Sequence, residues 1–110
     1  MTLFEKIIAR QIPATIVYED EWTIAFKDIA PMAPTHLLVV PKKVIVNVSE
    51  AGDDDTELLG RCLQTVRRVA ADAGLEHYRV VTNNGEAAGQ SVFHLHFHVL
   101  GGRGFGWPPG

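Results

Sequence analysis

The sequence has one cysteine, Cys62, among its 110 residues, so no disulfide bond can form within the chain. This absence excludes the small secreted domains that rely on a disulfide framework. Long apolar runs are also missing: none approaches the roughly 20 residues that cross a bilayer, and the first residues lack the apolar core of a signal peptide. We therefore predict a cytoplasmic protein with no membrane segment.

Basic residues are too few for a general nucleic-acid surface. The chain carries 10 Lys and Arg against 13 Asp and Glu, for a net charge of −3, and both signs are spread along its length. Proteins that bind nucleic acids usually present a clustered basic face, so no nucleic-acid partner is expected. The length corresponds to one domain over residues 1–110, and a hydrophobic content of 46% is enough for one modest core.

Short apolar segments separated by polar turns account for most of the chain. Thr2 and Glu5 have the spacing of a capping box before a short helix that ends near Arg10, and apolar residues at helical spacing predict a longer helix over residues 56–73. Strands are predicted at residues 15–18, 22–27, 36–40, 78–83 and 94–100. Five strands joined mostly by turns, with two helices, predict an α+β fold built on an antiparallel sheet.

Three of the five histidines stand in one stretch, where His94, His96 and His98 alternate with large apolar residues. Successive side chains of a strand point to opposite faces, so a strand here places the three imidazoles on one face. The residues that would face a core are Phe93, Leu95, Phe97 and Val99. This pattern leaves two chemical interpretations, metal binding and reaction at phosphorus.

Three histidines on one straight strand make a poor zinc site. At a rise of about 3.3 Å per residue, His94 and His98 are about 13 Å apart along the backbone, whereas zinc holds each nitrogen at about 2.0–2.1 Å. An ion would need His36 or a carboxylate from another element, and Cys62 has no second thiol beside it. We therefore predict no metal at this site and no cofactor.

Chemistry at phosphorus suits the stretch better. A neutral imidazole is a nucleophile near pH 7, and neighbouring N–H donors can hold the phosphoryl oxygens. The segment 83–91 precedes the histidines, and Gly85 and Gly89 allow its backbone to turn and approach a phosphate closely. Ser91 adds a hydroxyl at the start of the predicted strand.

Other polar residues have ordinary explanations when each is considered alone. Asp28 at a strand end is most often a turn residue, and His36 at a strand start is most often a structural histidine. Helix capping explains the acidic run 53–55 better than a metal does. Lys42 and Lys43 could attract phosphate or simply face solvent.

Several motifs together resemble the histidine triad family of nucleotide hydrolases and transferases. The stretch 94–98 reads His-x-His-x-His, two apolar residues follow it, and Gly-Gln-Ser-Val at 89–92 precedes it. Segments that resemble the Hint branch, the purine nucleoside phosphoramidases, are residues 28–31, 33–36 and 106–110. The similarity covers nearly the whole chain, from about Phe4 to Gly110.

The resemblance implies cleavage of a purine nucleoside 5′-phosphoramidate or an acyl-nucleotide through a nucleotidyl intermediate on His96. The catalytic set would be His36, Ser91, His94, His96 and His98. Within this set Ser91, His98 or His36 would supply the proton to the leaving group, and the sequence does not distinguish among them.

The resemblance also implies contacts to each part of the nucleotide. The residues around the purine base would be Phe4, Ile7, Phe26, Ile29 and Leu38. The Asp28 carboxylate would accept from the ribose hydroxyls. The residues that frame the phosphate would be Asn83, Gly89 and Gln90.

A homodimer is implied as well, in which two sheets join into one of ten strands. The tail from residue 101 is rich in glycine, and composition alone favours disorder. The resemblance instead places Trp107 beside the leaving-group pocket of the partner. The sequence departs from the Hint pattern at Val44, at 87–88 and at 103–106, which leaves the preferred leaving group open. Alternative functions are a dinucleoside polyphosphate hydrolase and a nucleotide-binding adaptor with incidental turnover.

Overall fold

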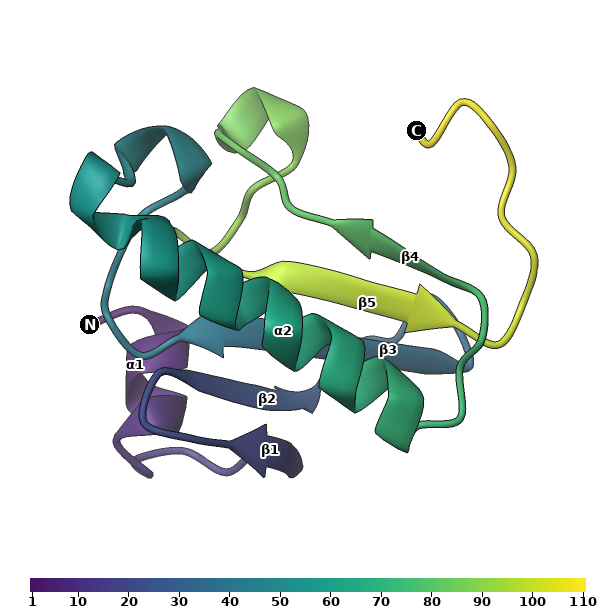
Figure 1. Ribbon diagram of the computed structural model, residues 1–110, viewed down its shortest axis with the longest axis horizontal. Helices are drawn as coiled ribbons and strands as arrows, with labels where there is room; N and C mark the ends of the chain where they lie inside the picture. The colour runs from purple at the N-terminus through teal and green to yellow at the C-terminus, as the bar shows by residue number, and fades with distance from the viewer.

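A five-stranded antiparallel sheet forms the centre of the molecule, as the computed structural model of residues 1–110 shows (Figure 1). Its strands are β1 Ile16–Glu19, β2 Thr23–Lys27, β3 Thr35–Pro41, β4 Tyr78–Val81 and β5 Phe97–Gly101, in the spatial order β1-β2-β3-β5-β4. The helices are α1 Leu3–Ile8 and α2 Thr56–Asp72, with 3-10 turns at Val48–Glu50, Asp53–Asp55 and Glu86–Ala88. The predicted α+β class is confirmed. Neither helix has the length and apolar character needed to span a bilayer.

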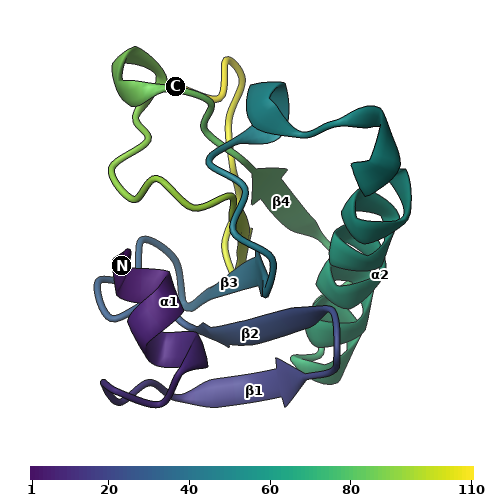
Figure 2. The ribbon, with the colours of Figure 1, turned by 90° about the vertical axis from the view of Figure 1, so that its left-hand side faces the viewer.

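The sheet separates two apolar layers. Helix α2 lies across one face, whereas α1 and the loop that leads to β5 lie on the other (Figure 2). Alternate side chains of β3 follow this division: Leu37 and Val39 belong to the cluster under α2, and Leu38 and Val40 belong to the cluster under α1. Because both faces are covered, β2 and β3 are almost entirely buried.

Helix α2 presents most of the apolar face that its sequence predicts. Leu58, Cys62 and Val66 are buried against the sheet, whereas Leu63, another apolar residue of the helix, is 54% exposed. Leu63 follows Cys62 by one residue, which turns its side chain about 100° round the helix toward solvent. Burial raises the pKa of the Cys62 thiol to about 12, as suits an inert packing residue.

Helix α1 begins with the predicted capping box. The Thr2 hydroxyl accepts from the Glu5 N–H at 3.1 Å, and the Glu5 carboxylate accepts from the Thr2 N–H at 2.9 Å. These two bonds stabilise the start of a helix of only six residues. Phe4 and Ile7 are buried against the sheet, so α1 becomes one wall of the pocket that holds the histidines.

The prediction of a strand over residues 94–100 is wrong for its first half. The backbone bends at 92–94, and β5 begins only at Phe97, where its pairing with Val39 of β3 starts. Before that point the backbone finds other partners. The Thr82 hydroxyl donates to the His96 carbonyl at 2.8 Å, and the Leu95 N–H donates to the Ile45 carbonyl.

This bend also changes where the apolar residues of the stretch lie. Leu95, Phe97 and Val99 are in the core under α2, as expected. Phe93 is 44% exposed and takes no part in that core, which corrects its predicted position. The alternation therefore predicts the apolar face only as far as the extended backbone continues.

Candidate active site

A pocket of about 340 Å³ opens on the α1 face of the sheet and contains most of the predicted site. The predicted residues that line it are Phe4, Ile7, Phe26, Asp28, Ile29, Leu38, Asn83, Gly89, Ser91, His96 and His98. Residues that sequence reasoning did not assign to it are Leu3, Ile12, Pro13, Ala14, Lys27 and Val92. Only Leu3 had a signal, because it belongs to the apolar stripe of the first helix. The others come from irregular segments and a strand end, which have no periodicity to mark them.

His96 has one ring nitrogen tied to the backbone and the other free. Its Nδ1 lies 2.7 Å from the His94 carbonyl oxygen, which can only accept, so Nδ1 carries the proton. Nε2 therefore keeps its lone pair, and the ring lines the pocket and packs edge to face with the Phe4 ring. Burial lowers the pKa of His96, so the imidazole is neutral near pH 7.

His98 and His36 form a second hydrogen-bonded unit. The Met32 N–H donates to His36 Nδ1 at 3.0 Å, so His36 carries its proton on Nε2. That nitrogen lies 2.8 Å from His98 Nδ1 and donates to it, which leaves the proton of His98 on Nε2. Burial, together with the charges that His96 and His36 can carry, lowers the pKa of His98 to about 4. Neutral His98 can thus present an N–H donor to the pocket that it lines.

The register of the sheet explains why His36 reaches His98. β3 and β5 are antiparallel neighbours, with His36 opposite Leu100 and Leu38 opposite His98. The two histidines are diagonal neighbours on one face, which is within reach of aromatic side chains. Their ring centroids are 5.1 Å apart.

Asp28 completes this corner of the site. Its Oδ2 lies 3.4 Å from His36 Nε2, and its Oδ1 accepts from the Ala30 N–H at 2.8 Å. Asp28, His36 and His98 therefore offer three potential metal ligands within 4.8 Å of one another. Two imidazoles on one tetrahedral zinc would have their nitrogens about 3.3 Å apart. The observed 2.8 Å between His36 Nε2 and His98 Nδ1 is the spacing of a hydrogen bond.

His94 does not line the pocket. It is fully buried, its Nε2 lies 2.8 Å from the Pro41 carbonyl, and its Nδ1 lies 3.4 Å from the Thr2 hydroxyl. The carbonyl requires the proton on Nε2, so Nδ1 accepts from Thr2. Burial lowers the pKa of His94, which also keeps it neutral. Its contribution is to hold His96 through its backbone carbonyl.

The loop between β4 and the histidines has the backbone freedom that its glycines suggest. Gly85 and Gly89 adopt φ of 98° and 100°, a region that other residues rarely enter. The Asn83 amide donates to the Gly89 carbonyl at 3.4 Å, and both residues line the pocket with Ser91. The loop thus brings Asn83, Gly89 and the hydroxyl of Ser91 into the same pocket as His96 and His98.

Gln90 lies away from the pocket, which corrects its predicted place beside the phosphate. The side chain is 2% exposed and makes three hydrogen bonds: it accepts from the Gly85 N–H and donates to the Val46 and Val92 carbonyls. All of its polar atoms are engaged inside the protein. Gln90 therefore holds the loop together and has no group free for a ligand.

The apolar part of the pocket is built by α1 and the two strands beside it. Phe4 and Phe26 meet edge to face with ring centroids 5.5 Å apart. Ile7 and Leu38 join them in the cluster under α1. Ile29 lies at the rim, with 94% of its surface exposed.

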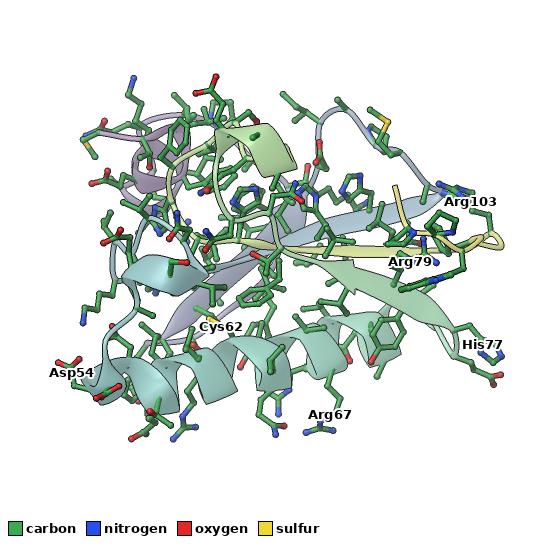
Figure 3. The ribbon with its side chains drawn as sticks, turned by 90° about the horizontal axis from the view of Figure 1, so that it is seen from above. Asp54, Cys62, Arg67, His77, Arg79 and Arg103 are labelled. Carbon is green, nitrogen blue, oxygen red and sulfur yellow. The ribbon has the colours of Figure 1, made fainter.

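Trp107 does not reach the pocket of its own chain, and it is 85% exposed. The tail beyond β5 forms no helix or strand, as its glycine content predicts. It is nevertheless attached, because Arg79 donates to the Gly106 carbonyl at 2.7 Å. Figure 3 shows Arg79 and Arg103 near each other at one end of the molecule, with the exposed His77 beyond them and outside the site.

A larger hollow of about 590 Å³ lies between the C-terminal end of α2 and the start of β3. It shares Asp28 and Lys27 with the first pocket and is also lined by His36, but His94, His96 and His98 do not line it. The smaller pocket combines an apolar wall, a free imidazole nitrogen and N–H donors, which is the more complete site.

The sheet has the topology of a histidine triad protein. Its neutral His96 lines a pocket beside His98 and is held by the His94 carbonyl, as expected for that class. The HIT domain model matches residues 9–105, and the chain belongs to this family. An uncharacterized HIT-like protein of Synechococcus elongatus is 56% identical over 99% of this chain and 96% of its own length. A 14 kDa zinc-binding protein of Zea mays is 49% identical, over 99% of this chain and 88% of its own.

Solved structures agree with this assignment. A HIT family hydrolase from Legionella pneumophila superimposes with a TM-score of 0.96 at 48% identity, and the match covers both chains completely. A histidine triad nucleotide-binding protein from Candida albicans has a TM-score of 0.84 at 33% identity, covering 98% of this chain and 83% of that one. The chain thus has a fold shared with hydrolases and with nucleotide-binding proteins of one family.

Proposed function

We propose that this protein is a purine nucleoside phosphoramidase of the Hint type, which also accepts acyl-nucleotides. The observation that carries the proposal is the free Nε2 of His96 at the pocket, held by the bond from Nδ1 to the His94 carbonyl. An imidazole in this state is ready to attack without first losing a proton. The apolar wall suits a purine base, and Asp28 offers a carboxylate to a ribose diol.

The reaction would proceed in two displacements at the α-phosphorus. In the first, His96 Nε2 bonds to phosphorus, the P–N bond breaks, and its electron pair leaves with the nitrogen, which takes up a proton. In the second, the oxygen of water bonds to phosphorus, and the P–Nε2 bond breaks with its electron pair returning to His96. A proton of the water passes to the group that had protonated the amine, and the nucleoside monophosphate is released. Together the two displacements replace a direct attack of water on the charged phosphoramidate.

His98 and Ser91 are the two donors that line the pocket and can assist departure of the amine. His36 is excluded from direct contact with the leaving group because its Nε2 is already bonded to His98. It would act on the substrate only through His98. Asn83 and Gly89 would frame the phosphoryl oxygens, while Gln90 would hold the same loop by accepting from the Gly85 N–H.

The zinc-binding name of the maize relative suggests a different function for the same residues. A zinc ion at Asp28, His36 and His98 would have to break the His36–His98 hydrogen bond and spread the two rings. The proposed reaction uses that bond and needs no metal.

The test is a comparison of substrates with a strong chelator present throughout. We expect kcat/KM for an adenosine 5′-phosphoramidate to exceed that for a dinucleoside polyphosphate by at least about tenfold, a difference of about 1.4 kcal/mol. The reverse order would favour a dinucleoside polyphosphate hydrolase. Binding of the nucleoside monophosphate without turnover of either substrate would favour an adaptor. Activity that disappears in chelator and returns with one equivalent of zinc would contradict the metal-free reaction.

We also infer a homodimer, in which the β4 strands of two protomers join the sheets. β4 is an edge strand, and its Tyr78 and Val80 are among the exposed large apolar residues. Such a pairing would continue the hydrogen bonding of the sheet, and Trp107 would lie beside the leaving-group pocket of the second protomer.

Deleting residues 107–110 is therefore expected to change the order of preference among aromatic and aliphatic phosphoramidates without removing the reaction. An aromatic side chain beside the leaving group favours apolar amines by contact area. The measurement is kcat/KM for a paired substrate set on full and shortened chains, with mass by light scattering as the control for the dimer. An unchanged order of preference would show that Trp107 does not select the leaving group.

A further inference from the structure

We propose that Arg103, in the tail, is a positioning residue for the His36–His98 pair and acts through the backbone of Met32. This inference rests on the proposed function, because its kinetic consequence concerns proton delivery to the leaving group. Its structural consequence concerns which nitrogen of each ring carries the proton, and that can be observed without turnover.

The contact that carries the inference is a double hydrogen bond to one carbonyl. Arg103 donates to the Met32 carbonyl through Nε at 3.3 Å and through Nη2 at 3.0 Å. The N–H of the same residue donates to His36 Nδ1 at 3.0 Å. The two peptide groups flank the Met32 Cα, so a carbonyl held in place restricts where the N–H that determines the protonation of His36 can lie.

Arg103 is itself held in place. Its Nη1 donates to the Gly104 carbonyl at 2.9 Å, and its guanidinium lies 4.2 Å from the centre of the Phe105 ring. Arg79 of β4 approaches the same ring at 5.1 Å and donates to the Gly106 carbonyl. Fixed in this way, the guanidinium loses little further freedom when it binds Met32.

The loop that contains Met32 has few internal constraints. Pro31 and Pro34 have no N–H to donate, and Ile29 and Met32 are largely exposed. The tail packs on this loop at a second point, because a Cβ at Gly102, with φ of 90°, would lie 2.8 Å from Pro34. Gly102 and Arg103, at the start of the tail, therefore hold the loop around Met32, which is otherwise exposed.

The tautomers show what this support achieves. With Met32 in place, His36 carries its proton on Nε2, and His98 carries its own on the Nε2 that can serve the pocket. If the Met32 N–H moves away, His36 can shift its proton to Nδ1. Its Nε2 then accepts, His98 must donate from Nδ1, and His98 no longer offers an N–H to the leaving group.

The experiment compares R103M, R103K and the control R67M in protein labelled with ¹⁵N-histidine. Arg67 is an exposed residue of α2 that bonds only to the Gln64 side chain. At neutral pH we expect ring-nitrogen spectra of the wild type and R67M to show the proton of His36 and of His98 on Nε2. R103M is expected to show a new population with those protons on Nδ1, and R103K, which retains a cationic donor, to resemble the wild type.

Kinetics supply the second measurement. R103M is expected to lower kcat for an alkylamine phosphoramidate by roughly threefold to tenfold, the effect of one lost hydrogen bond. The same variant should leave turnover of a nucleoside 4-nitrophenyl phosphate nearly unchanged, because its leaving group, 4-nitrophenolate, departs without taking up a proton. Nε2 tautomers retained in R103M, or an equal shift in R67M, would overturn the inference. If the wild type turns over no phosphoramidate, the proposed function fails, while the spectra still decide the part of Arg103.

Discussion

Replacing His96 by alanine is expected to abolish turnover, with a loss of at least about 10⁴-fold in kcat. His96 Nε2 is unprotonated and free of any hydrogen bond, whereas the unprotonated Nδ1 of His98, the other histidine that lines the pocket, already accepts from His36. The affinity for a nucleoside monophosphate should stay within about tenfold, because Asp28 and the apolar wall of the pocket, proposed to hold the purine base, remain. Alanine at the exposed His77 is the matched control and should leave both quantities unchanged.

A covalent intermediate distinguishes a nucleophile from a mere phosphate ligand. A rapid quench that avoids acid should recover the nucleotidyl group on His96 of the wild type, and label on any other residue would refute the assignment.

The pH dependence of kcat/KM has a defined sign as well. Burial lowers the pKa of His96, so its imidazole stays neutral below the ordinary value of about 6.5. The acid limb of kcat/KM should therefore lie below that pH.

The substitution Q90E is expected to lower the free energy of unfolding by about 3 kcal/mol at neutral pH. A carboxylate can still accept from the Gly85 N–H, but it cannot donate to the Val46 and Val92 carbonyls. Two carbonyls would lose their donors and face a buried negative charge. The measurement is chemical denaturation, and Q64E on the exposed face of α2 is the control, expected to change stability by less than about 0.5 kcal/mol.

The deficit of Q90E should depend on pH in a predictable direction. Burial raises the pKa of the new carboxyl in the folded state above its unfolded value. The protonated form is therefore favoured in the folded protein, and the stability that it provides is present at low pH and lost as pH rises through the folded pKa. The gap between Q90E and the wild type should narrow toward pH 4. A variant that is as stable as the wild type but has a raised KM would instead support the prediction that Gln90 contacts the phosphate.

The elements with strong local signals were predictable. The capping box of Thr2 and Glu5, the helical stripe of α2 and the strands β2 and β3 follow from short-range spacing, and the structure agrees with them. The start of β5 was not predictable. β5 begins opposite Val39 although β3 continues to Pro41, because the residues before Phe97 bond elsewhere: Thr82 donates to the His96 carbonyl, and the Leu95 N–H donates to the Ile45 carbonyl.

The sequence by itself determined the fold class, the row of histidines and the family that it resembles, because all three are contained in residue types and spacing. Only the tertiary structure decided which of these residues face the pocket. It buried His94 and Gln90, and it joined His36 to His98 through the register of β3 and β5. It also decided which nitrogen of each imidazole carries a proton. That choice depends on whether a carbonyl or an N–H lies within hydrogen-bonding distance, and such partners come together only when distant segments pack.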